Sequence, residues 1–399
     1  METQVAVLVP SKEKRYFLLT DTGKKVLKTE ELIEWLERSD GAPLLGPMGG
    51  SGQNFFVRAF QLGKEVHRIP WFQLEEAAGV TVGATPEERA EGILRAWQNQ
   101  PALFYRFGLP DADVLMVREL TRVRLNIQEY RKMATLQYKA AFRDLEPLLS
   151  EGRKFIALRT MFADPGMIQG ALADEEELER RIKQLVEKLP IWHWLHPEKG
   201  SPLPRVLGLG PSLGGSLIGE IGDIRNFPAP ENLRSYARLH VTLDGEFPRR
   251  KKGEVSSWNR YLNRALWLWS TDQMPRYDHV WRHLYDYRKA NELQAHPEPV
   301  ARKVVDRRNR ERTVWDFTLK HCDSRAKRWV AVKLLNYVFD VWSAGEIGSD
   351  PEGWYPGSRW PAFFRQVETD LAGGLATYLE AEIPKRRRRE PEEEVEEEL

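Results

Sequence analysis

The chain has 399 residues, enough for two or three domains, and its 60 lysines and arginines nearly balance its 59 aspartates and glutamates. With a net charge of +1, any charge-dependent binding must come from local patterning rather than from the total. The single cysteine, Cys322, excludes an intramolecular disulfide and a thiolate metal cluster. No apolar run approaches the roughly 20 residues that span a membrane, and the first residues show no signal-peptide pattern. We therefore expect a soluble, cytoplasmic protein with no membrane partner.

Residues 1–110 predict an α/β domain. The apolar runs 5–9 and 16–20 are typical of two strands, and a turn signal, Asp-Thr-Gly, follows them. A helix is predicted over 28–38, with Thr29 as a possible cap. The segment that follows, GPMGGSGQNFFVRAFQLGKEVHRIP, predicts a loop, a helix and another strand. Strands that alternate with helices favour an α/β layer.

Residues 111–200 predict a helical arm. Apolar residues recur at helical spacing over 111–150, with arginines and lysines between them. A second helix is predicted over 174–189, capped by Asp174 and ended by Pro190. Two such helices can form an antiparallel coiled coil. The alternative is two helices that pack against their own domain, with their charges merely solvated.

A glycine-rich stretch begins at Arg205. Glycines alternate with large aliphatic residues from Pro211 to Ile221 and predict a tightly packed helix there, entered through a Gly-Leu-Gly turn. The exposed N–H groups at the start of such a helix can bind an anion. We assign nucleic-acid contacts here to Gly208, Gly210, Ser212 and Gly214. The alternative is a close helix crossing with no ligand.

A run of four cations follows this helix, and a predicted helix start comes directly after the run. Serines at a helix N-terminus with cations just before them suit a phosphate backbone. We assign nucleic-acid contacts to Arg249, Arg250, Lys251, Lys252, Ser256, Ser257, Trp258, Asn259, Arg260 and Arg264.

Residues 274–342 are predicted to be helical and strongly basic. The cations Arg302, Lys303, Arg307, Arg308, Arg310 and Arg312 cluster in sequence, and Arg325, Lys327 and Arg328 lead an apolar helix. A basic cluster beside a buried helix fits a nucleic-acid groove, so Arg307, Arg308 and Arg310 are further candidate contacts.

The remaining C-terminal segments predict no site. His279, His283 and His321 lack the spacing of metal ligands, so no metal site is assigned to them. Residues 345–361 predict a loop, and the low-complexity tail 385–399 is predicted to be disordered.

The stretch GLGPSLGGSLIGEIGDIRNFPAPENLRSYARL, followed by NRYLNRAL, resembles the C-terminal domain of DEDD-type insertion-sequence transposases. These are the bridge-RNA-guided recombinases of the Piv/MooV invertase class, in which this stretch is a helix-hairpin-helix-like domain that holds nucleic acid. With the basic PRRKKGEV element it is also similar to the Nop domain of box C/D RNA–protein particles and of the RNA-guided TIGR-associated (Tas) proteins. The resemblance implies a coiled-coil arm that dimerises the chain, and a prokaryotic or phage source.

The N-terminal segment resembles the RuvC-like, RNase H-fold domain of the same transposases, through the Ser11-Lys12 pair, the Gly-Gly turn and an Ala-Glu helix. Four carboxylates of that family hold Mg²⁺ for phosphodiester chemistry. At the matching positions this sequence has Val9, Gly46, Pro86 and Arg89. The nearby Glu87, Glu88 and Glu91 are expected to form a solvated helix face. We therefore predict no catalytic or metal residue, and Mg²⁺ only if a nuclease site exists elsewhere.

The expected fold is α/β plus all-α. A degenerate RuvC-like domain (1–110) precedes a coiled-coil arm (111–200), a helical Nop-like or transposase-like domain (201–384) and a charged tail (385–399).

Three functions fit these observations. The first is an RNA-guided DNA-binding protein without its own nuclease, a homodimer whose partners are a guide RNA and a target DNA. The second is an active recombinase, but its serine nucleophile is missing from the matching stretch HVTLDGEF, which offers only Thr242 and Asp244. The third is a structural scaffold of an RNA–protein particle. The lost carboxylates and the missing serine favour binding over chemistry.

Overall fold

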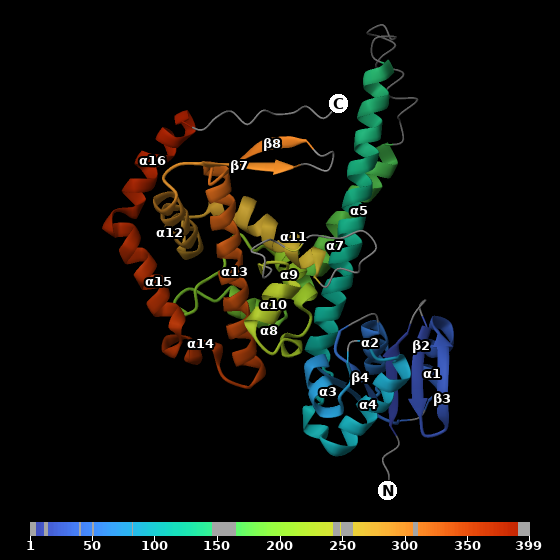
Figure 1. Cartoon of the computed structure of the whole chain (residues 1–399). Helices are drawn as coiled ribbons and strands as arrows, with labels where there is room; N and C mark the ends of the chain where they lie inside the picture. Colours follow the sequence, from blue (N-terminus) through green and yellow to red (C-terminus); the bar gives the residue numbers. More distant parts are fainter. Residues whose placement is uncertain are drawn as a thin grey trace. The chain divides into compact units, whose positions relative to one another are not determined.

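A computed structural model describes residues 5–11, 15–39, 41–49, 52–81, 83–145, 165–241, 248, 258–305 and 310–389 (Figure 1). The chain divides into two compact units. Unit 1 consists of Met1–Trp192 and Pro211–Pro228, and unit 2 consists of His193–Gly210 and Ala229–Leu399. No helix among the described residues is long and apolar enough to cross a membrane.

Unit 1 is built on a mixed six-stranded sheet. Its strands are β1 (Ala6–Pro10), β2 (Arg15–Thr20), β3 (Gly23–Lys28), β4 (Leu44–Pro47), β5 (Val66–Ile69) and β6 (Tyr105–Arg106). Their order is β3-β2-β1-β4-β5-β6; β4 runs parallel to both β1 and β5, and the other neighbours are antiparallel. This arrangement is consistent with an RNase H-like fold, as the sequence predicted.

Helices cover both faces of this sheet. Successive strand residues point to opposite sides, so the apolar strands supply side chains to a core on each face. The helices are α1 (Thr29–Arg38), α2 (Gln53–Gln61), α3 (Trp71–Ala78) and α4 (Pro86–Asn99), followed by the short η1 (Pro101–Leu103). On one face Leu8 packs with Leu32 of α1 and Phe56 of α2. On the other face Val7 and Val9 belong to a core that includes residues of α3 and α4.

Two long helices complete unit 1 together with the glycine-rich helix. They are α5 (Leu109–Leu145) and α7 (Pro165–Val186). The two helices run antiparallel. Val117 of α5 and Val186 of α7 both lie beside Gly215, and seven residues further along α5 Arg124 donates to Glu179, which comes seven residues earlier in α7. The glycine-rich helix α9 (Pro211–Ile221) and the turn η3 (Ile224–Asn226) follow in the same unit.

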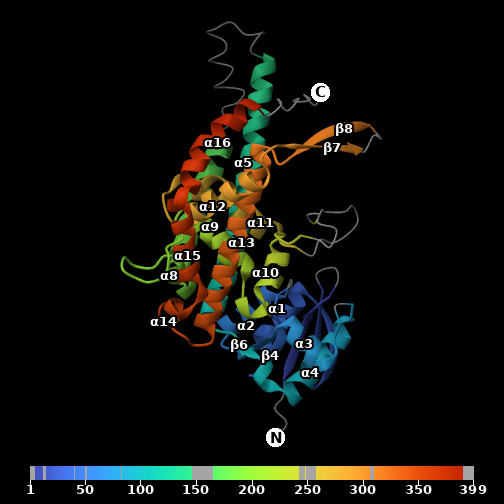
Figure 2. The same ribbon diagram turned by 60° about the vertical axis from the view of Figure 1, so that its left-hand side comes forward.

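Unit 2 is largely helical, and its helices surround α13 (Figure 2). The elements in order are α8 (Pro190–Leu195, which starts in unit 1), α10 (Pro230–Tyr236), α11 (Arg260–Leu268), η4 (Trp269–Gln273), η5 (Met274–Arg276), α12 (Val280–Ala295), β7 (Val300–Val305), β8 (Glu311–Asp316), α13 (Leu319–Glu346), α14 (Pro351–Trp354), η6 (Tyr355–Gly357), α15 (Arg359–Asp370), η7 (Leu371–Leu375) and α16 (Ala376–Arg389). Aromatic rings form much of the core: Trp281 and Trp360 lie edge-on to Tyr337, at centroid distances of 5.4 and 5.5 Å. Such pairs add geometric preference to the apolar burial.

Several predicted boundaries were wrong in unit 1. Strand β3 was not predicted, because its lysines look unsuited to a sheet, although lysines are typical of an edge strand. Strand β4 was not predicted either. Asp174 does not cap the second arm helix, because α7 begins nine residues earlier and continues through two glycines. Thr29 is the first residue of α1 rather than its cap.

In unit 2 the largest error concerns residues 300–316. They were predicted to be helical, but 300–305 and 311–316 form the antiparallel hairpin strands β7 and β8, which project from the helices in both views (Figures 1 and 2). The β-branched residues of VARKVV and RTVW favour strands, and the abundance of arginine obscured that signal. The predicted loop 345–361 contains α14, and α16 extends through Arg389 into the tail predicted to be disordered.

A buried network of charges holds unit 1 together. Arg68 of β5 donates to Asp111 Oδ1 at the start of α5 (2.7 Å) and to Asp223 Oδ2 after α9 (2.9 Å). Arg225 closes the network by donating to Asp223 (2.9 and 2.8 Å) and to Asp111 (3.0 Å). Two guanidinium groups therefore neutralise two carboxylates. Burial disfavours the Asp223 carboxylate, but the Arg225 hydrogen bonds and both positive charges outweigh it and lower its pKa.

We expect Arg68→Met to lower the free energy of unfolding by about 3–5 kcal/mol, since it leaves buried carboxylates with less compensation. The matched control is Arg106→Met on the neighbouring strand. Arg106 is 76% exposed and 3.7 Å from Glu65, so its loss should cost below about 1 kcal/mol. Urea unfolding measures both values. Equal losses of unfolding free energy in the two variants would show that the buried network contributes no more stability than an exposed ion pair.

The same network predicts a pH dependence. A carboxyl whose pKa is lowered by folding stabilises the native state above its unfolded pKa of about 3.9, and that contribution is lost as pH falls through the lower folded pKa. The wild type should thus lose more unfolding free energy than the Asp223→Asn variant when pH drops from about 5 to 2. Parallel pH profiles would contradict this assignment.

Candidate nucleic-acid interface

The sheet of unit 1 has no room for a carboxylate at the position matched to the family glutamate. Gly46 lies in β4, and a Cβ added to it would overlap the ring of Phe56 and come within 3.0 Å of the Leu8 carbonyl oxygen. On the adjacent strand, Val9 is fully buried in the apolar core. Both positions are therefore part of the packing of the sheet.

The two later positions are also structural. Pro86 is the first residue of α4, and the Arg89 guanidinium lies over the Trp71 ring at 5.2 Å. Glu88 forms a capping box with Thr85, which lowers the pKa of Glu88 through hydrogen bonds from the Thr85 backbone and side chain. Glu87 and Glu91 both pair with Lys24 on the surface, as expected for a solvated helix face.

These residues do not fit a two-metal site, which needs several carboxylates around one point. Val9, Gly46, Pro86 and Arg89 supply no such ligand. Within the part of the chain that the structure describes, no group of three or more His, Cys, Asp or Glu side chains could hold a metal ion.

The glycines of α9 permit a close helix crossing. A Cβ on Gly219 would lie 2.8 Å from the backbone nitrogen and Cα of Arg118 in α5. A Cβ on Gly215 would lie 2.9 Å from Ile182 of α7 and 3.2 Å from Val117 of α5. Glu220, also on α9, accepts two hydrogen bonds from Arg122 of α5, at 2.7 and 2.8 Å. The close crossing that the sequence analysis kept as an alternative is therefore present in unit 1.

The four residues assigned to the entry of this helix have different environments. Gly208 has a φ of +78°, and a Cβ there would meet the Gln273 backbone at 3.0 Å, so this glycine permits a turn within unit 2. Gly210 is exposed and has open space around it. The Ser212 carbonyl accepts from the Ser216 hydroxyl, and Gly214 is buried. Gly210 thus remains the most accessible candidate of the four.

The start of α11 is organised by Asn259. Its side-chain oxygen accepts from the N–H groups of Tyr261 and Leu262, and its amide donates to the Tyr236 hydroxyl. Asn259 is therefore a buried N-cap, and the helix begins at Arg260, after the serines predicted to start it. Beside it, the guanidinium of Arg238 lies 4.5 Å from the Trp258 ring. Arg260 is exposed and donates to the Tyr261 hydroxyl. Arg264 is half-buried.

Next to α11, unit 2 contains a basic cavity of about 380 Å³. Among the described residues, four cations line it, Arg238 after α10 and Arg325, Lys327 and Arg328 on α13, and no carboxylate does. Trp267 of α11 also lines it, with Ser270 and Thr271 of the π-helical turn η4. The cavity thus combines positive charge with an aromatic ring, the two features that bind nucleic acid.

Neighbouring acids balance part of this charge. Glu292 accepts from Arg325 at 2.7 Å, and Asp323 pairs with Lys327 at 2.7 Å. Burial and the nearby charge of Arg238 lower the pKa of Arg328 to about 10. The positive charges of Arg238 and Arg328 repel each other, so a bound anion between them would be favourable.

The three cations of α13 were predicted from the sequence, whereas Arg238 and Trp267 were not. Arg238 has a φ of +60° at the end of α10, a conformation that sequence does not reveal. Trp267 and Trp269 are two residues apart, so they lie on different sides of the helix. Trp269 is buried and donates its indole N–H to the Leu207 carbonyl, whereas Trp267 is 61% exposed.

Nine of the assigned residues remain to be placed. Arg310 is exposed at the start of β8. The residues Arg249, Arg250, Lys251, Lys252, Ser256, Ser257, Arg307 and Arg308 lie outside the described part of the chain.

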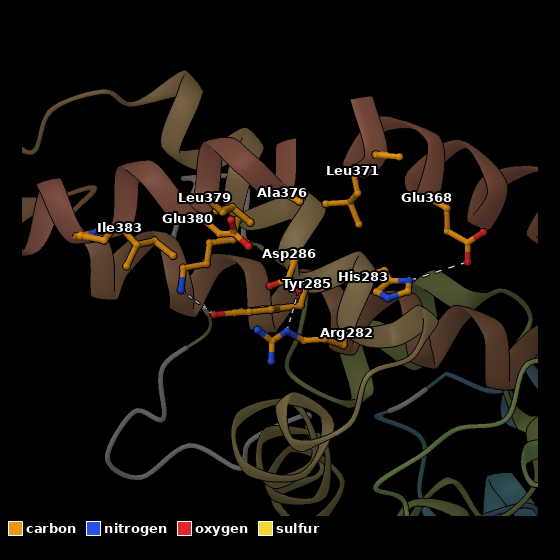
Figure 3. A pocket seen from close by; sticks show the side chains of 13 residues that line it. Arg282, His283, Tyr285, Asp286, Glu368, Leu371, Ala376, Leu379, Glu380 and Ile383 are labelled. Atoms are coloured by element: carbon orange, nitrogen blue, oxygen red, sulfur yellow. Dashed lines mark hydrogen bonds and ion pairs between the residues drawn. The ribbon is translucent and has the colours of Figure 1, made fainter. Parts of the chain in front are cut away.

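A second cavity in unit 2, of about 560 Å³, lies between α12 and the helices η7 and α16 (Figure 3). Leu371, Leu379 and Ile383 form its apolar wall. On the opposite wall, Lys289 donates to the Tyr285 hydroxyl at 2.8 Å, and Arg282 donates to Asp286 at 2.8 Å. Among the residues that line it, the acids Asp286, Glu368 and Glu380 outnumber the cations Arg282 and Lys289, so the cavity has no excess positive charge to favour a nucleic acid.

Residues 201–286 match the transposase IS116/IS110/IS902 family. No curated protein matches the chain. The matched segment begins before α9 and ends within α12, so it includes Arg238, α11 and η4 of the basic cavity. This segment is therefore transposase-like.

We expect Gly219→Ala to destabilise the protein by about 1–3 kcal/mol, because its methyl group would press on the Arg118 backbone. Gly210→Ala is the matched control, since nothing lies within 4 Å of its added Cβ. Thermal unfolding compares the two variants. If Gly210→Ala were the more destabilised one, the assignment of Gly219 to the crossing would be wrong.

Proposed function

We propose that this is a transposase-related, RNA-guided DNA-binding protein without a nuclease of its own. The observation that carries the proposal is that the transposase-like match supplies one part of the cation-lined cavity, namely Arg238, Trp267 and the residues of η4, while α13 supplies the other three cations. A cluster of cations with an exposed tryptophan suits a nucleic-acid backbone and its bases.

The packing of the sheet supports binding rather than cleavage. A transposase with an RNase H-like domain would need carboxylates near the ends of β1 and β4, where Val9 is buried and Phe56 fills the space beside Gly46. We therefore infer that the sheet serves as a scaffold and that any DNA cutting requires a separate enzyme.

The arm supports the further proposal that two copies associate. Leu109, Met116, Val123 and Tyr130 of α5 are exposed although apolar, and they recur every seven residues. A strict heptad spacing places side chains along one seam of a helix, where a second helix can cover them. We propose that the covering helix is α5 of a second copy.

The guide RNA provides the direct test. We expect the protein, purified from a host that carries its native locus, to bring down one discrete small RNA. Changing Arg249, Arg250, Lys251 and Lys252 together to alanine should weaken binding of that RNA, because contacts to phosphates are lost. Each lost contact should also flatten the dependence of log K on log salt by about 0.7–0.9 units of slope. Filter binding at several salt concentrations measures both effects.

The matched control removes four exposed cations of unit 1, at Arg38, Arg58, Arg106 and Arg180. It should leave the affinity for the RNA nearly unchanged. Recovery of heterogeneous RNA alone, or an unchanged salt slope in the first variant, would count against the proposal. Mg²⁺-dependent cleavage of DNA by the purified protein would favour the active recombinase instead.

The dimer is tested by Val123→Glu, which places a charge in the middle of the exposed heptad seam. We expect light scattering to report a dimer for the wild type and a monomer for this variant, since a buried unpaired carboxylate is costly. Lys132→Glu changes an exposed residue on the opposite side of the helix and should remain dimeric. A monomeric wild type at micromolar concentration would exclude the seam as an interface.

A further inference from the structure

We propose that the basic cavity of unit 2 receives one unpaired nucleotide of the bound RNA. The base would stack on the indole of Trp267, and its phosphate would lie at the guanidinium groups of Arg238 and Arg328. This inference rests on the proposed function, because it specifies which part of an RNA the site binds.

The exposure of Trp267 is the first observation. All fourteen tryptophans lie in the described part of the chain, and only Trp267 and Trp315 are exposed. Trp315 belongs to the projecting hairpin, whereas Trp267 lines a cavity. A large indole left in solvent inside a cation-rich hollow offers a flat surface for a base.

The backbone at Arg238 is the second observation. This residue adopts a left-handed conformation where α10 ends, a position that glycine usually occupies. Its Nε donates to the Pro248 carbonyl at 2.8 Å, and its own carbonyl accepts from Arg328 at 2.9 Å. The unfavourable conformation thus fixes one arginine next to another at the cavity. A strained residue that brings like charges together is typical of a ligand site.

The size and the polar groups of the cavity are the third observation. A volume of about 380 Å³ is at the lower end of the range for small-molecule sites, so it suits one nucleotide rather than a duplex. Asn263 donates to the Ala237 carbonyl, and His321 accepts from the Phe317 N–H. Their remaining polar atoms, the Asn263 side-chain oxygen and His321 Nε2, are the groups that we assign to the edge of the base.

The test compares three RNA hairpins that differ at one position of the stem. One carries a single unpaired adenosine, the second is fully paired, and the third has an abasic ribose in place of the adenosine. Fluorescence anisotropy with the full-length protein measures their affinities. We expect the unpaired adenosine to improve binding by about 5-fold to 150-fold over the abasic hairpin, the range that stacking of one base gives.

Variants separate stacking from charge. Trp267→Ala should abolish the preference for the adenosine and leave the salt slope unchanged, whereas Trp267→Phe should retain part of the preference. Arg328→Gln should lower the affinity for both unpaired hairpins and flatten the salt dependence by about 0.7–0.9 units of slope. Because Trp267 is exposed, its variants should melt at the temperature of the wild type, which the experiment checks.

The outcomes distinguish this inference from the proposed function. If the wild type binds the paired hairpin as tightly as the one with an unpaired adenosine, or if Trp267→Ala keeps the preference, the cavity is not a nucleotide site but RNA binding stands. If the wild type binds none of the hairpins, both proposals fail. A deoxyribose hairpin with the same unpaired adenosine completes the comparison: tighter binding of the DNA would overturn the assignment to RNA.

Discussion

The architecture of unit 1 depends on one buried arginine. Arg68 lies in the sheet with a side chain that is 2% exposed, and a charge so far from water persists only with close counter-charges. Asp111 and Asp223 supply them, and they come from the start of α5 and from the turn after α9. The glycine-rich segment is therefore fixed to the sheet by electrostatics, in addition to its contacts with α5 and α7.

The fixed position of α9 changes the interpretation of its glycines. A glycine-rich turn before a helix is typical of an anion site. Two of the glycines, Gly215 and Gly219, instead allow α9 to lie against α5 and α7 without side chains between the backbones. The basic cavity belongs to unit 2 and is lined by residues of α11 and α13. The glycines that set the packing of α9 and the cations that line the cavity are therefore different residues.

The sequence predicted elements whose signals are local. The α9 helix was found at its observed bounds, because Pro211 favours a first turn and Gly222, with a φ of +76°, favours an end. Strands β1 and β2 were found from their apolar runs. The Arg68–Asp223 bond joins residues 155 positions apart, and no local pattern announces such a partner. Trp267 could not be separated from Trp269 for a related reason, since only the packing of α11 decides which ring is covered.

The contact between Gly46 and Phe56 has a consequence for how this sheet can change over evolutionary time. A glutamate introduced at position 46 alone would collide with an aromatic ring in the core, and so would even an alanine. Phe56 would first have to be replaced by a smaller residue, which on its own would leave a void beside Leu8 and Leu32. Each single step is unfavourable, and only the two together restore space for a carboxylate. A carboxylate at this one position therefore requires two coordinated substitutions, and Val9, Pro86 and Arg89 would need substitutions of their own before the sheet could hold a metal ion.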